Sequence, residues 1–112
     1  MLNKLVNNRL SFVVFFAKRL ASIRFNVNLG EQMKMLNNNK QFERALELFD
    51  KYREETTIEK CSNWIIIQAL KACTEIGDLQ RGSNIHNLLS SRLKHDPYVL
   101  PSLIHLYSKF IQ

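Results

Sequence analysis

From about residue 31 onward, apolar and polar positions alternate at the spacing of an α-helix. The clearest stretch has four apolar residues three and four positions apart, with charged residues between them: Phe42, Ala45, Leu46 and Phe49. This spacing places the four side chains on one side of a helix. It predicts an amphipathic helix over about residues 40–53, preceded by a turn at Asn37-Asn38-Asn39 whose side chains can cap its first turn.

A second, broader apolar run begins at Trp64 and ends at Gly77. Adjacent isoleucines widen its apolar face, which predicts a helix that is packed on two sides. Asp78 follows the glycine and is a good N-cap, so a third helix is expected from there to about residue 93.

The dipeptide Asp96-Pro97 predicts the start of a fourth helix, because an acidic N-cap followed by proline is a typical start signal. Apolar residues at helical spacing follow it: Leu100, Leu103, Ile104, Tyr107 and Ile111. A weaker helical pattern covers about residues 28–37, with Gly30 near its start. Since no stretch has the composition or alternation of a β-strand, the sequence predicts an all-α protein of about five helices.

These helices recur at a nearly constant interval. The expected starts at Trp64 and Tyr98 are 34 residues apart, and Ala45 and Gly82, at equivalent points of two other helices, are 37 apart. A period in this range is typical of stacked pairs of antiparallel helices.

The net charge of +6 is concentrated at the front of the chain. Residues 1–30 contain five basic side chains and no acidic one, whereas residues 31–112 contain 11 basic and 10 acidic side chains. The helical part therefore lacks the strong positive field on which many nucleic-acid-binding proteins depend.

Residues 1–30 have the composition of a mitochondrial import leader, since they are basic, acid-free and partly apolar. The apolar run at residues 10–17 is only eight residues long, which is too short to span a membrane. A secretory signal peptide is the alternative interpretation. The sequence thus divides into a leader, 1–30, and a helical repeat domain, 31–112, in a protein expected in the mitochondrion.

Candidate chemistry is sparse. The two cysteines, Cys61 and Cys73, form no CxxC pair. The three histidines fall on separate helices or joints, with no carboxylate or thiol at ligand spacing: His86, His95 and His105. We therefore expect no catalytic residue, no metal and no cofactor. Cys73 is expected to be a small packing residue within its helix.

Residues 71–86 begin with Lys71-Ala72-Cys73 at the end of a helix, make a turn at Gly77 and continue with Gly82 and Ile85-His86. This order resembles the KAC-like helix end, the glycine turn and the G…IH pattern of the long-variant motif in pentatricopeptide-repeat proteins of the organelle RNA-editing type. Residues 102–109 resemble the first helix of a following motif. Residues 42–50 resemble a second helix that many helical repeats share. The resemblance covers about two motifs, at about 26–62 and 63–96, and a partial third at 97–112.

The resemblance implies a right-handed α-solenoid of antiparallel helix pairs that binds single-stranded RNA, an organellar transcript, at about one base per repeat. In that family the fifth and last residues of each motif contact the base. Carried over, these positions are Gly30, Ser62, Ile67, Asp96 and Pro101. Asp96 matches the family pattern, whereas Gly30, Ile67 and Pro101 have no polar side chain, which predicts weak sequence-specific readout.

Other side chains allow two interpretations each. Trp64 could stack on a base or pack between helix pairs. A set of basic residues could contact phosphates or form a solvated face: Lys51, Arg53, Lys60, Arg92 and Lys94.

The chain ends inside the third motif, so a truncated member or a fragment is expected. Its last helix is then expected to lack a covering partner at Leu103, Leu106, Tyr107 and Phe110, which would leave an apolar face for a protein. The function predicted is non-enzymatic RNA binding in organellar RNA processing or modification. A protein-interaction scaffold is the alternative, and no residue constellation supports a small helical enzyme or the zinc deaminase found in some editing proteins.

Overall fold

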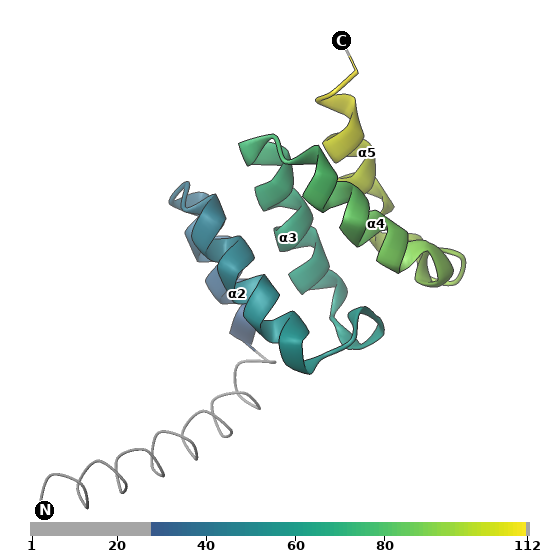
Figure 1. Cartoon of the computed structure of the whole chain (residues 1–112), viewed down its shortest axis with the longest axis horizontal. Helices are drawn as coiled ribbons and strands as arrows, with labels where there is room; N and C mark the ends of the chain where they lie inside the picture. Colours follow the sequence, from purple (N-terminus) through teal and green to yellow (C-terminus); the bar gives the residue numbers. More distant parts are fainter. Residues whose placement is uncertain (1–27, 112) are drawn as a thin grey trace, which may run out of the picture.

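The computed structural model describes residues 28–111, and this part of the chain consists of helices joined by short turns, without a β-strand. A helix over residues 28–38 is followed by α2 (Phe42–Glu55), α3 (Asn63–Ile76), α4 (Leu79–Leu93) and α5 (Leu100–Ser108), with 3₁₀ turns η1 (Ile58–Lys60) and η2 (Pro97–Val99) (Figure 1). The all-α prediction is confirmed. The predicted leader lies outside the described residues, except that residues 28–30 belong to the first described helix.

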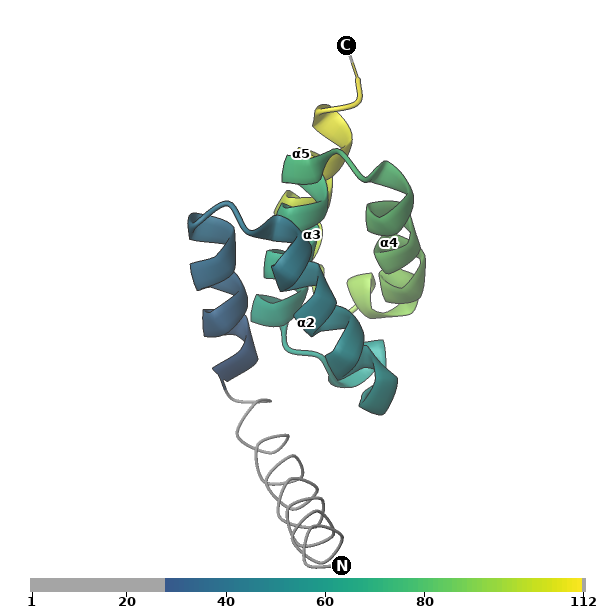
Figure 2. The same ribbon diagram turned by 60° about the vertical axis from the view of Figure 1, so that its left-hand side comes forward.

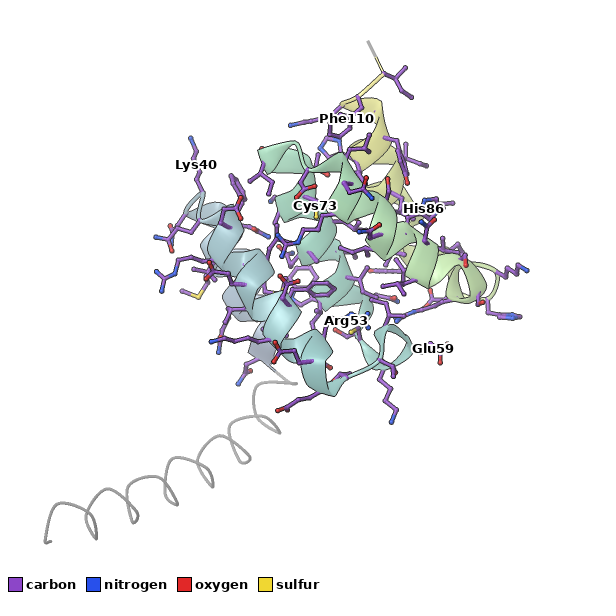
Figure 3. All side chains as sticks on the ribbon, in the orientation of Figure 1. Lys40, Arg53, Glu59, Cys73, His86 and Phe110 are labelled. Atoms are coloured by element: carbon purple, nitrogen blue, oxygen red, sulfur yellow. The ribbon has the colours of Figure 1, made fainter. Side chains whose placement is uncertain are left out.

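Helix 28–38 and α2 run in opposite directions and form the first pair (Figure 2). Lys40 adopts a left-handed backbone conformation between them, with φ 60°, and its side chain points into solvent (Figure 3). The expected asparagine cap is wrong. The residue before α2 is Gln41, whose side chain makes no capping hydrogen bond within the described chain. Asn37 cannot cap α2, because it belongs to the preceding helix and is buried.

α3 and α4 form the second antiparallel pair. At the start of α3, Ser62 Oγ accepts a hydrogen bond from the backbone N–H of Ile65 at 3.3 Å. Gly77 ends α3 with a left-handed φ of 75°, a conformation that suits glycine at a helix C-terminus. Asp78 Oδ1 then accepts from the backbone N–H of Arg81 at 3.0 Å. The predicted end at Gly77 and the predicted cap at Asp78 are confirmed.

The last helix begins with a 3₁₀ turn. Asp96 Oδ1 accepts from the backbone N–H of Tyr98 at 3.2 Å, and Pro97 occupies the first helical position, where its missing N–H needs no partner. The α-helix itself starts at Leu100. The Asp96-Pro97 signal therefore predicted the place where the helix starts correctly, but not the form of its first turn.

α3 is the central helix of the described chain. It packs against α2, α4 and α5, with α2 on one side and α4 on the other (Figure 1). Its core-facing side chains are fully or almost fully buried: Ile65, Ile66, Ala69, Leu70, Ala72 and Cys73. The packing on two sides that the broad apolar run predicts is confirmed, as is the expectation that Cys73 is a packing residue.

A buried amide pair joins helix 28–38 to α3. Asn37 and Gln68 are only 3% and 4% exposed. Asn37 Nδ2 donates to the backbone oxygen and to the side-chain Oε1 of Gln68, both at 3.0 Å. Asn37 Oδ1 has no hydrogen-bond partner in the described part of the chain. The pair keeps Asn37 between the helices, which explains why it does not cap α2.

α5 packs against both α3 and α4. It approaches α4 closely at Gly82, where an added Cβ would lie 2.5 Å from Leu106 Cδ2. Leu103 and Leu106 are 3% and 0% exposed. The expectation that they lack a covering partner is therefore wrong, because α5 turns these residues toward the preceding pair.

Tyr107 is also half-buried, and its hydroxyl lies 2.7 Å from His86 Nδ1 on α4. Phe110, by contrast, is 41% exposed, as expected (Figure 3). The other large apolar side chains that remain exposed between residues 97 and 111 are Tyr98, Leu100, Ile104 and Ile111.

Candidate nucleic-acid interface

The main exposed surface of α3 is one row of residues. Trp64, Ile67, Lys71 and Glu75 stand three or four positions apart, so their side chains leave the helix on the same face. Trp64 is 40% exposed, Lys71 and Glu75 are exposed, and Ile67 is half-buried. The opposite faces of α3 are covered by the neighbouring helices, so a ligand of α3 would contact this row.

Trp64 lies against the first described helix at Gly30. A Cβ on Gly30 would lie 1.9 Å from Trp64 Cδ1, so the indole fits there only because the residue is glycine. Lys34 Nζ lies 5.4 Å from the centroid of the ring, within the range of a cation–π interaction. Trp64 therefore packs between helix pairs and remains 40% exposed. Gly30, a predicted base contact, is buried beneath the indole.

A groove of about 260 Å³ lies between α3 and α5. Seven residues line this α3–α5 groove: Ile67, Lys71, Thr74, Glu75, Pro101, Ser102 and His105. Two predicted RNA contacts, Ile67 and Pro101, thus face the same groove although they are 34 positions apart in sequence. The apolar walls suit a planar ligand such as a nucleotide base, and Lys71 and Glu75 place one basic and one acidic side chain beside it.

The other two predicted contacts, Ser62 and Asp96, both precede helices. Ser62 is exposed and caps α3. Asp96 receives a donor on each carboxylate oxygen, since Tyr98 N–H bonds to Oδ1 and Asn63 Nδ2 lies 3.0 Å from Oδ2. The pKa of Asp96 lies below its ordinary value. The hydrogen bond from Asn63 lowers it most, followed by that from Tyr98 N–H, and the nearby Arg92 guanidinium also lowers it. Asp96 is therefore an ionised acceptor.

Arg92 is neither part of a solvated charged face nor free to bind phosphate, the two roles that the sequence suggested. It is half-buried, and its Nη1 donates to the backbone oxygens of Ile58 at 2.9 Å and Cys61 at 2.6 Å. Its Nη2 donates to Asn63 Oδ1 at 2.6 Å. Arg92 thus ties the end of α4 to the turn before α3 and does not form part of a solvated face. Three other members of that basic set are exposed: Lys51, Lys60 and Lys94.

Sequence reasoning missed four residues of this surface: Lys34, Asn63, Lys71 and His105. Lys71 could have been found, because it stands seven positions after Trp64 and so shares its face. No local spacing indicates the other three. They reach this surface only by contact with residues that are distant in sequence: Lys34, Asn63 and His105.

The described residues offer little for acid–base or metal chemistry. No group of three His, Cys, Asp or Glu side chains between residues 28 and 111 could hold a metal ion. Burial raises the pKa of the Cys73 thiol to about 11, so it is protonated at neutral pH. Burial also raises the pKa of Cys61, although Arg53 and Arg92 oppose the shift. Neither cysteine is activated as a nucleophile.

A second groove, of about 420 Å³, lies between α2 and α4. Eight residues line this α2–α4 groove: Phe49, Asp50, Arg53, Glu54, Arg81, Asn84, Ile85 and Leu88. An ion pair between Arg81 and Asp50 joins the two helices there. This groove contains two acidic and two basic residues, which balance in charge, and none of the predicted RNA contacts lines it.

The described chain is therefore all-helical, with two grooves between its helices that are large enough for a small ligand. Comparison with family models, curated proteins and solved structures gives no match for this chain. Within residues 28–111, every helix is too short or too polar to cross a membrane.

Proposed function

We propose that this chain binds single-stranded RNA as a right-handed solenoid of pentatricopeptide-type helix pairs, acting without catalysis in organellar RNA processing or modification. The motif resemblance supports this proposal. So does the order of helices, because helix 28–38 with α2 is followed by α3 with α4 and then by α5. The basic, acid-free residues 1–30 support a mitochondrial location.

The observation that carries the proposal is the α3–α5 groove. In a stacked array this groove lies between the first helices of neighbouring pairs. Ile67 and Pro101 provide apolar walls for a base, and the exposed Lys71 is available for a phosphate. Trp64 extends the same row as a partly exposed aromatic side chain, and stacking on an aromatic ring tolerates bases of any sequence.

Fluorescence anisotropy of the full chain with a labelled, random-sequence 12-nucleotide RNA tests the proposal. A DNA pool of the same length is the control, and both are titrated at low and at physiological salt. We expect preference for RNA over DNA at both salt concentrations. Since residues 31–112 have nearly balanced charge, a steep salt dependence of the full chain would be assigned to the basic residues 1–30. Absence of RNA binding by a sample whose circular dichroism is helical would overturn the proposal.

Charge reversal at Lys71 tests whether the RNA lies on the proposed face. Lys71→Glu should weaken RNA binding about five- to tenfold, since it replaces a phosphate contact by repulsion. Lys51→Glu makes the same change at an exposed position on α2 and should bind nearly as the unmodified chain does. Equal losses in the two variants would show that RNA is held by net charge and not by this face.

A protein-interaction scaffold is the second candidate, and the exposed apolar side chains around α5 favour it. Tyr98, Ile104 and Ile111 are 69%, 63% and 78% exposed, and exposed apolar side chains of this size are common at protein contacts. A folded chain that binds no RNA, but binds a protein partner less tightly after Ile104→Glu, would favour the scaffold.

A further inference from the structure

Three side chains from three elements form a hydrogen-bonded row that ends on Asp96. Arg92 of α4 donates to Asn63 Oδ1 at 2.6 Å. Asn63, the first residue of α3, donates through Nδ2 to Asp96 Oδ2 at 3.0 Å. Arg92 is itself anchored on the backbone oxygens of Ile58 and Cys61.

Chemistry fixes the direction of every hydrogen bond in this row. A guanidinium can only donate and an ionised carboxylate can only accept. Asn63 must therefore turn its oxygen toward Arg92 and its NH₂ group toward Asp96. The other carboxylate oxygen of Asp96 is held by the backbone N–H of Tyr98. With a donor on each oxygen, the carboxylate has a fixed plane, and each oxygen keeps a second acceptor position.

The preceding helix junction lacks such a row. Ser62, which stands 34 positions before Asp96, makes its capping bond to Ile65 N–H. The residue 34 positions before Arg92 is Ile58, which has no side-chain donor. The row is therefore a feature of the Asp96 site and not a general device of these helix junctions.

We propose that Asn63 and Arg92 are positioning residues for Asp96, and that they hold its carboxylate as a pre-oriented acceptor for a hydrogen-bond donor of bound RNA. The identity of the ligand rests on the proposed function. Pre-orientation strengthens binding because the carboxylate loses less rotational freedom when the ligand arrives. Through its bonds to Ile58 and Cys61, Arg92 also fixes the acceptor relative to the preceding helix pair.

A double-mutant cycle on the full chain, with the random 12-nucleotide RNA, tests this proposal. Asn63→Leu removes the amide donor at nearly constant size, and Asp96→Ala removes the acceptor. We expect each single variant to weaken binding about five- to tenfold. The double variant should bind no more weakly than Asp96→Ala, since Asn63 acts through Asp96. Losses that multiply in the double variant would show independent roles and overturn the proposal.

The carboxyl pKa of Asp96, measured by NMR without RNA, is a second readout that general destabilisation would not move. Asn63→Leu and Arg92→Met should both raise it, because each weakens the stabilisation of the ionised form. Asn87→Leu, at an exposed position on α4, is the matched control and should change neither this pKa nor RNA affinity. An unchanged Asp96 pKa in Asn63→Leu would overturn the positioning role. Raised pKa values in a chain that binds no RNA would overturn the proposed function instead.

Discussion

At the scale of single residues, two glycines allow a large side chain of a neighbouring helix to pack closely. Gly30 makes room for the Trp64 indole, and Gly82 makes room for Leu106. Both lie inside helices, where glycine costs about 1 kcal/mol relative to alanine. The close approach of the neighbouring helix compensates for that cost. Glycine at these two positions therefore reflects packing between helices and not a turn.

Gly30→Ala should lower the free energy of unfolding by about 1–3 kcal/mol, because the new Cβ would overlap the indole. Denaturant unfolding measures the change. In a Trp64→Leu background the overlap is absent, so the same substitution should be neutral or stabilising by up to about 1 kcal/mol. A loss of equal size in both backgrounds would contradict the proposed contact.

The Cys73 thiol makes stability depend on alkaline pH. Its pKa is raised to about 11 in the folded chain, whereas an exposed thiol titrates near 9. Above pH 9 the unfolded chain therefore loses a proton that the folded chain retains, and stability falls as pH rises from 9 to 11. Full titration corresponds to about 2–3 kcal/mol. Cys73→Ala should show a smaller decrease over this range in denaturant unfolding, and an identical decrease would refute the assignment to Cys73.

At the scale of elements, the capping side chains can be compared directly. Ser62→Ala and Asp78→Ala each remove a side-chain hydrogen bond to a helix N-terminus, and each should cost about 1 kcal/mol of stability. Gln41→Ala is the matched control, because Gln41 precedes α2 without a capping bond. Thermal unfolding followed by circular dichroism measures all three. A loss at Gln41 as large as those at the caps would contradict this account.

Helix ends were predictable where the signal is local. Gly77 and Asp78 act on their own backbone, so neighbouring residues alone specify the turn between α3 and α4. The asparagine turn was not predictable in this way, because Asn37 bonds to Gln68, 31 positions away. Local propensity suggested that Asn37 caps α2, but its side chain forms a buried hydrogen bond to Gln68 instead.

The candidate site shows the same division. The sequence named Ile67 and Pro101 through a resemblance, but only the packing of α5 on α3 brings them to one groove. Likewise, helical spacing identified Leu103 and Leu106 as apolar, while their burial depends on where α5 packs. Spacing gives the faces of a helix, but it does not say which neighbour covers each face.

At the scale of the whole molecule, the central position of α3 predicts cooperative unfolding. α3 supplies packing surface to both helix pairs and to α5, so neither pair can separate without exposing its core. Trp64 is the chain's single tryptophan and reports on the contact between helix 28–38 and α3. Its fluorescence and the far-ultraviolet circular dichroism should therefore change at the same denaturant concentration. Two separated transitions would show that the pairs unfold independently.

The buried pair of Asn37 and Gln68 also determines which alignments of the first helix are disfavoured. If helix 28–38 slid along α3 by one turn, both amides would be buried without their partners, and each would carry a desolvation penalty of about 1–3 kcal/mol. An apolar pair of similar size would pack nearly as well in either alignment. The amide pair thus adds less to the stability of the native fold than to the free-energy difference between the native alignment and shifted alignments. The native alignment is selected although it leaves Asn37 Oδ1 buried without a hydrogen-bond partner among the described residues.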